Sequence, residues 1–344
     1  MIVFGVIIFW ILPIIVMLGI LHIIYLEYRQ DRIPILLYHR LISRDAVERD
    51  EIRDDEMIFV SYDVSFAEQM AYLHKAGYAT LDFDDYLAIR DGKMPRPKKP
   101  VIITFDDGYL STYTMAFPEL KKYGQKATIF VVLQPNDYSL QCVEGVDSFL
   151  THAQIREMAD HNISIQSHTL THCVLSALDE DDALYELTES RRQISEITGR
   201  SVDHIAIPRA GYSRKTRELV KKAGYKSVCC NNKGTANNLS DLLALPRIVV
   251  ERDMNVTDFD RCLTPRSSVM LRIIGNIKRI PERIGGPQLA KKVRDLLYSG
   301  ALRSLFETRS MKMMVTAFSM LYVIGSVLFT GYLVARWVSS GGTP

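Results

Sequence analysis

The sequence predicts an α/β fold of parallel strands joined by crossover helices, and a closed barrel fits it better than an open sheet. Short apolar runs alternate with helical segments along the middle of the chain. Six or seven such units fit between residues 34 and 250. All but one of the 82 Asp, Glu, Lys and Arg residues lie in 27–312. This distribution excludes a disordered chain or a polytopic transporter and leaves one globular domain between uncharged ends.

The predicted strands are short apolar runs, the pattern of strands that are buried on both faces. They cover 34–38, 100–105, 127–132, 163–166, 204–207, 226–229 and 245–250. Cys229 and Cys230 fall at the sixth run, where core packing is their expected role. The five cysteines of the chain are an odd set without framework spacing, which favours a reducing compartment over a disulfide-stapled domain.

The predicted helices follow these strands and show apolar residues at helical spacing, as in Phe66, Met70 and Leu73. They cover 66–76, 83–89, 110–123, 151–159, 181–198 and 213–223. Glycine follows four of them, at positions 77, 124, 199 and 224, as expected for a helix end. Thr151 is the expected N-cap of the fourth. The charged stretch 43–63 has little periodicity and predicts a loop.

Both ends of the chain are predicted transmembrane segments. Residues 1–27 begin with an apolar run that has no preceding Lys or Arg and no small-residue cleavage site, which favours an uncleaved anchor over a signal peptide. Residues 313–337 contain 23 uncharged residues between Lys312 and Arg336 and end at Trp337. A buried core helix is the alternative for this second run. We therefore expect an integral protein of the cytoplasmic membrane.

The segment 261–312 carries a net charge of +9, whereas 27–260 carries −8. Its mixture of basic and apolar residues predicts amphipathic helices at an anionic lipid surface, with the solvated face of ordinary barrel helices as the alternative. Nucleic-acid binding is not expected, because the acidic domain would repel phosphates. The basic residues beside both membrane segments favour a cytosolic domain by the positive-inside rule.

Chemistry is concentrated where predicted strands end. Asp106 and Asp107 directly follow the strand at 100–105, and Gly108 permits a tight turn. Functional groups of parallel α/β folds collect at this edge of the sheet. Neighbouring side chains on extended backbone point in opposite directions, so the two carboxylates can have different roles. A polar turn with an Asp N-cap is the alternative, and it explains one acid better than two.

Histidines follow two other predicted strands. His168 and His172 come after the strand at 163–166, and residues four apart converge if the segment turns helically. Two imidazoles and one Asp would suit Zn, with Ni, Co or Fe as alternatives. A core or surface role is the usual reading of a lone histidine. His39 ends the first strand and would reach the same rim in a barrel.

These motifs resemble the polysaccharide deacetylase family, also called the NodB-homology domain or carbohydrate esterase family 4. Thr104-Phe-Asp-Asp-Gly-Tyr109 and Ser167-His-Thr-Leu-Thr-His172 carry the resemblance, which runs from about Ile33 to Val250. Lesser matches are the segments 205–212 and 245–248. The resemblance implies a distorted (β/α) barrel of about seven parallel strands, here flanked by the two transmembrane helices. It also implies hydrolysis of an N-acetyl group on a sugar.

The resemblance implies a role for each motif residue. Asp107, His168 and His172 look like metal ligands, and Asp106 looks like the general base that activates water. A metal lowers the pKa of water towards about 7 and polarises the amide carbonyl. The backbone of Tyr109 and the turn around Arg209 are the candidates for contact with the substrate oxyanion.

The sequence departs from the family in three places. No histidine follows His204, so the late histidine that protonates the leaving amine in many members is absent. Tyr38-His39 matches the version in poly-N-acetylglucosamine deacetylases, which makes His39 the expected general acid. Ala206 stands where an Arg that orients the base is usual, and Arg209 or Arg247 could compensate. The late Trp of the family is also absent.

These features are compatible with three functions. A membrane-anchored, metal-dependent sugar N-deacetylase leads, with a hexosamine-containing polymer or a lipid-linked glycan as substrate, and with membrane lipid and glycan-synthesis machinery as further partners. A degenerate barrel that binds acetylated glycan without cleaving it is the alternative. A magnesium phosphoesterase is disfavoured, since Mg²⁺ prefers oxygen ligands to histidine. The family favours an extracytoplasmic domain, and we adopt that side against the charge and cysteine arguments.

Overall fold

The computed structural model describes residues 32–45, 60–135, 148–210, 212–252 and 254–263. The predicted membrane segments at 1–27 and 313–337 lie outside these ranges, as does the basic segment beyond residue 263. Among the described residues, no helix combines the length and the apolar character that crossing a bilayer requires.

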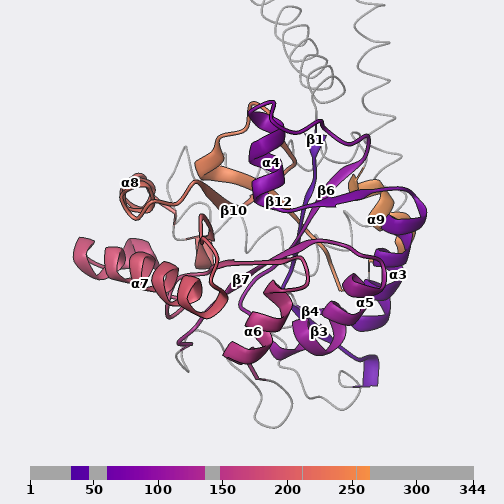
Figure 1. Cartoon of the computed structure of the whole chain (residues 1–344), viewed down its shortest axis with the longest axis horizontal. Coiled ribbons are helices and arrows are strands. Elements are labelled where there is room, and N and C mark those ends of the chain that lie inside the picture. Colours follow the sequence, from indigo (N-terminus) through magenta and orange to yellow (C-terminus); the bar gives the residue numbers. More distant parts are fainter. Residues whose placement is uncertain (1–31, 46–59, 136–147, 211, 253, 264–344) are drawn as a thin grey trace, which may run out of the picture. The chain divides into compact units, whose positions relative to one another are not determined.

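Seven parallel strands form a closed ring, which confirms the predicted barrel. In spatial order they are β2 (Ile35–Tyr38), β12 (Leu245–Val249), β10 (Ser227–Lys233), β9 (His204–Ala206), β8 (Ile163–Ser167), β7 (Ala127–Val131) and β6 (Pro100–Phe105). In Figure 1 the strands β6, β7, β10 and β12 lie in the middle of the view, with helices around them. The ring closes because β6 also pairs with β2, from Ile35 opposite Ile102 to Tyr38 opposite Phe105. The eighth strand of the sheet, β5 (Ala79–Leu81), pairs with the start of β6.

The α-helices of the described chain lie close to their predicted positions, except the last, which was not predicted. They are α3 (Asp63–Lys75), α4 (Phe83–Arg90), α5 (Phe117–Lys122), α6 (His152–Ala159), α7 (Glu180–Thr198), α8 (Arg214–Lys222) and α9 (Val256–Leu263). Thr151 caps α6 in a reciprocal capping box with Gln154, as its position predicts. Gly199 ends α7 at φ 67°, a left-handed conformation that glycine adopts without steric cost.

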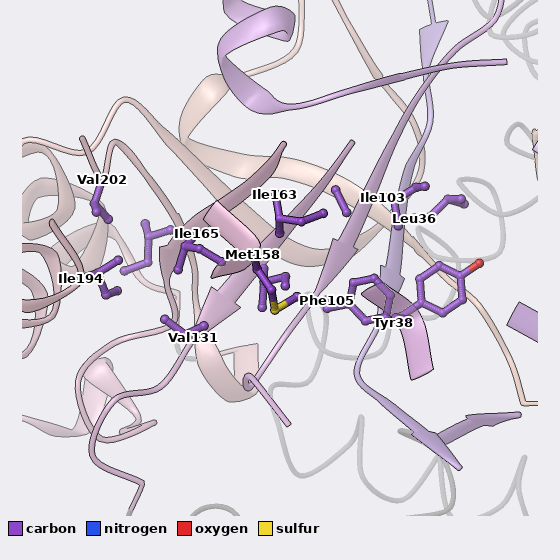
Figure 2. Packing of buried hydrophobic residues seen from close by; sticks show 14 of the residues in the cluster. Leu36, Tyr38, Ile103, Phe105, Val131, Met158, Ile163, Ile165, Ile194 and Val202 are labelled. Atoms are coloured by element: carbon purple, nitrogen blue, oxygen red, sulfur yellow. The ribbon is translucent and has the colours of Figure 1, made fainter. Parts of the chain in front are cut away.

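The core has an inner and an outer part, because side chains alternate across each strand. On β6, Ile102 belongs to the inner cluster, whereas Ile103 and Phe105 belong to the outer one beneath the helices. Figure 2 shows the outer cluster, in which the rings of Tyr38 and Phe105 stack at 5.3 Å. Each fully buried aliphatic or aromatic side chain of this kind contributes about 1.5–3 kcal/mol.

Helix α4 closes the end of the barrel where the strands begin. Its buried residues Phe83, Tyr86 and Ile89 belong to the inner cluster. The Phe83 ring lies 5.3 Å from that of His204, the first residue of β9. With this end filled by apolar side chains, the opposite rim, where the strands end, is the place for polar chemistry.

The structure corrects three local predictions. The stretch 43–63 is not all loop, because β4 (Val60–Tyr62) pairs with β3 (Arg40–Ile42) and α3 begins at Asp63. Strand β5 was not predicted either. Three-residue strands are too short to produce a readable alternation. The helix expected at 110–123 contains a π-helical turn at Thr112–Ala116 before α5. Cys229 and Cys230 are buried in β10, as expected.

Candidate metal centre

The predicted site residues of β2, β6 and β8 meet at the rim where the strands end. The register pairs Tyr38 with Phe105, so His39 and Asp106 leave adjacent strands at the same height. The Asp106 amide donates to the Tyr38 carbonyl at 3.0 Å, which extends that pairing by one residue. On the other side, the His168 amide donates to the Val131 carbonyl at 3.0 Å. Barrel closure thus joins segments that are 129 residues apart, from position 39 to position 168.

A strained turn directs the second carboxylate of the pair. Asp107 has φ 74°, a left-handed conformation that is uncommon outside glycine, and Gly108 follows at φ 81°. A Cβ at Gly108 would lie 3.2 Å from the Val131 side chain, so both its φ and the available space favour glycine. The Asp107 carbonyl accepts from the Val132 amide at 3.2 Å, which ties the turn to the end of β7.

Asp107, His168 and His172 form the group of three ligand side chains found in the described residues. Asp107 Oδ1 lies 3.3 Å from His168 Nε2 and 3.5 Å from His172 Nε2, and all three residues are buried. Asp107 Oδ1 and His172 Nδ1 have no hydrogen-bond partner. Because an orphaned buried carboxylate oxygen is costly, a cation between the three groups would account for it. The donor set of two imidazoles and one carboxylate fits a divalent transition metal.

The backbone orients the first imidazole. His168 Nδ1 lies 2.9 Å from the Ala206 carbonyl and donates to it, which turns Nε2 towards Asp107. Such contacts hold ligand histidines in proteins. No sequence pattern predicts this contact, because every residue carries a backbone carbonyl.

The two imidazoles converge without the helical turn that the sequence suggested. No helix covers 168–174, and the ring centroids of His168 and His172 lie 5.1 Å apart. Thr169 (φ 66°) and His172 (φ 64°) are both left-handed, which tightens the loop. The i and i+4 spacing therefore indicated the correct pair through an incorrect local conformation.

Arg247 supplies the guanidinium that Ala206 cannot. Its Nη1 and Nη2 donate to Asp106 Oδ1 and Oδ2 at 2.6 and 2.7 Å, a bidentate pair whose side chains are 1% and 3% exposed. Two parallel charge-assisted bonds fix both the position and the ionisation of the carboxylate. Arg209, the other candidate, is exposed in a left-handed turn at φ 51°. The open choice between the two arginines is thus decided for Arg247.

Burial and nearby charges shift the pKa values of Asp106, Asp107 and His172. Burial raises the pKa of Asp106, but Arg247 and His168 outweigh it and hold that pKa below its usual value. Burial also opposes ionisation of Asp107, yet the close approach of His168 and the charge of His39 lower its pKa to about 2. Burial and the His168 charge lower the pKa of His172 to about 4. Both carboxylates are therefore anionic at neutral pH, and His172 is neutral and able to ligate.

His39 and the two predicted substrate contacts, Tyr109 and Arg209, differ in burial and in what they contact. His39 is half-buried; burial lowers its pKa, against the nearby charges of Asp107 and Asp106. The Tyr109 ring is 8% exposed and stacks on Phe149 at 5.3 Å, so this side chain supports the rim. Arg209 is exposed, and its charge contributes to the lowered pKa of His172.

Comparison with known proteins places this site in a family. The sequence profile of polysaccharide deacetylases matches residues 93–228. YxkH of Bacillus subtilis, classed among the polysaccharide deacetylases, is 32% identical over 229 residues, which cover 66% of this chain and 75% of YxkH. The chain therefore belongs to the polysaccharide deacetylase family, as the motifs indicated.

Two further proteins, one compared by sequence and one by structure, are similar to this chain. The poly-beta-1,6-N-acetyl-D-glucosamine N-deacetylase of Staphylococcus aureus is 27% identical over 255 residues, covering 66% of this chain and 82% of the enzyme. Among solved structures, the Streptococcus pyogenes deacetylase PplD in complex with acetate is 27% identical at a TM-score of 0.60. That match covers 69% of this chain and all of PplD.

Proposed function

We propose that this chain is a metal-dependent N-deacetylase that removes acetyl groups from a hexosamine-containing glycan. The convergence of Asp107, His168 and His172 beside the Asp106–Arg247 pair carries this proposal. A metal ligand set next to a fixed, anionic base is the arrangement that amide hydrolysis requires. The deacetylase relatives support the reaction type and the N-acetylglucosamine substrate class.

Asp107, His168 and His172 hold the metal in this proposal, and Zn is the expected ion, with Ni, Co or Fe as alternatives. When bound, such an ion polarises the acetyl carbonyl and makes water more acidic. Asp106 accepts the proton of the attacking water, and Arg247 keeps its oxygens in place. Backbone N–H groups near Tyr109 and Arg209 face the oxyanion.

His39 protonates the departing amine. It is adjacent to Asp106 at the rim, and the pKa lowered by burial makes its imidazolium a stronger acid. The alternative of a degenerate, glycan-binding barrel arose from the missing arginine at Ala206. Arg247 fills that role, so no feature of the described residues favours a loss of catalysis.

His39→Ala should slow hydrolysis only where the leaving group needs a proton. We expect a loss of about 100-fold in kcat on N-acetylglucosamine oligomers and a much smaller loss on an aryl acetate ester, whose leaving group needs no proton. The exposed His152 provides the control, and His152→Ala should leave both rates unchanged. Equal losses on amide and ester substrates would remove His39 from this role.

Membrane anchoring forms the second part of the proposal. The apolar segments 1–27 and 313–337 and the basic segment 261–312 would hold the active site near the bilayer. A nascent polymer or lipid-linked glycan then becomes the expected substrate, and glycan-synthesis enzymes become the expected neighbours. We propose an extracytoplasmic domain. Protease accessibility in sealed right-side-out vesicles tests it, and a fully protected domain would reverse the assignment.

Acetate release from N-acetylglucosamine oligomers, measured with and without a metal chelator, tests the proposed activity. We expect release to stop when the metal is removed and to return when zinc is added.

A further inference from the structure

Helix α7 presents two buried polar side chains, Glu186 and Ser190, to the loop that carries His168 and His172. They are four residues apart and so share one face of the helix. Glu186 is 8% exposed and Ser190 is fully buried. The hydrogen bonds of both side chains go to Ser167 and to the loop 169–171, and the chemistry described above does not use them.

The Glu186 carboxylate binds the middle of the loop through three hydrogen bonds. Its Oε2 accepts from the backbone amides of Leu170 and Thr171 at 2.9 and 3.0 Å. Its Oε1 accepts from Thr171 Oγ1 at 2.8 Å. Successive amides that point at one anion form a concave backbone cradle, and a carboxylate is a strong acceptor for it.

Ser190 binds the beginning of the same loop. Its Oγ donates to the Thr169 carbonyl at 3.2 Å and lies 2.7 Å from Ser167 Oγ. Ser167 Oγ in turn accepts from the Thr169 amide at 3.2 Å. Both peptide groups of the left-handed Thr169 are thus fixed on the α7 side.

We propose that Glu186, supported by Ser190, is a positioning residue that sets metal affinity. It does so by holding the loop 169–172 in the conformation in which Thr169 and His172 have left-handed backbone. Without these bonds, Thr169 and His172 would relax towards the right-handed or extended backbone that their side chains favour. His172 Nε2 would then leave the vicinity of Asp107 Oδ1, from which it lies 3.5 Å. This inference rests on the proposed metal site.

Zinc affinity of the folded full-length protein tests this role, measured by competition with a chromophoric chelator. We expect Glu186→Ala to raise the zinc Kd about 10–100-fold, the usual effect of losing a group that supports a ligand. Glu186→Gln should stay within about threefold of wild type, since its amide can accept from both N–H groups and donate to Thr171 Oγ1. Glu196→Ala, on the exposed side of α7, is the matched control.

The melting temperature, measured alongside, separates positioning from general stability. A lower melting temperature with an unchanged zinc Kd in Glu186→Ala would overturn the proposal. If Glu186→Ala does not fold, Thr171→Val decides, because it removes one bond to Glu186; we expect a rise of about threefold or more in Kd. A wild-type Kd in that variant would also overturn it. Wild-type protein that binds no zinc would instead defeat the metal site itself.

Discussion

Asp106→Asn should reduce kcat/KM on N-acetylglucosamine oligomers by about 100- to 10,000-fold, the usual contribution of a positioned general base. The substitution keeps the shape of the side chain but removes its ability to accept a proton. Zinc affinity should change little, because Asp106 lies outside the ligand set of Asp107, His168 and His172. Acetate release and the zinc Kd, measured on the same preparation, give the two numbers.

Stability needs a control in this experiment, because Asp106→Asn leaves the buried guanidinium of Arg247 without its anion. Breaking a buried pair by removing one partner costs about 3–5 kcal/mol. The double variant Asp106→Asn/Arg247→Met removes both charges and should recover part of this stability while remaining inactive. Activity that returns with stability in the double variant would show that Asp106 is structural and not the base.

Arg247→Met is the second large effect, and it should depend on pH where Asp106→Asn does not. Arg247 is the main charge that lowers the pKa of Asp106, against burial, which raises it. Without Arg247, burial is opposed only by the charges of His168 and His39, so the pKa of the carboxyl rises. We expect a strong loss of activity at neutral pH that is partly regained as the pH rises and Asp106 ionises again.

The same pair makes a prediction for stability. A carboxyl whose pKa is lowered on folding stabilises the protein above its unfolded pKa, and this contribution is lost as the pH falls through the folded pKa. At neutral pH, Arg247→Met should therefore lower the free energy of unfolding by about 3–5 kcal/mol. Arg192→Met, at exposed ion pairs on α7, should leave the free energy of unfolding nearly unchanged. Urea unfolding measures both, and equal costs would contradict the buried pair.

The sequence predicted those features of the fold and the site that depend on a single segment. The apolar run 100–105 predicted β6 with its observed bounds, and the acids behind it marked the rim. The number of strand–helix units favoured a closed ring over an open sheet, and the pairing of β6 with β2 confirms the closure. Residue types and spacing indicated the two histidines, and the family resemblance implied Asp107 as the third ligand. The left-handed residues of the loop 169–172 could not be predicted, because neither Thr nor His signals that conformation.

Contacts between distant segments could not be predicted in the same way. The choice between Arg209 and Arg247 depended on which side chain enters the barrel beside Asp106, and 141 positions separate that pair. The same holds for the contact of His168 with the Ala206 carbonyl and for the hydrogen bonds of Glu186 to the loop 169–172, since both join distant segments. Each requires the register of the ring or the placement of α7, which no local pattern contains.

Metal-dependent acetate release is the most direct measurement of the central claim. Metal-free protein should release no acetate from N-acetylglucosamine oligomers, and added zinc should restore release in proportion until one equivalent per chain is bound. Asp106→Asn should also bind one equivalent of zinc per chain but release no acetate. Full acetate release by metal-free wild-type protein would contradict the account.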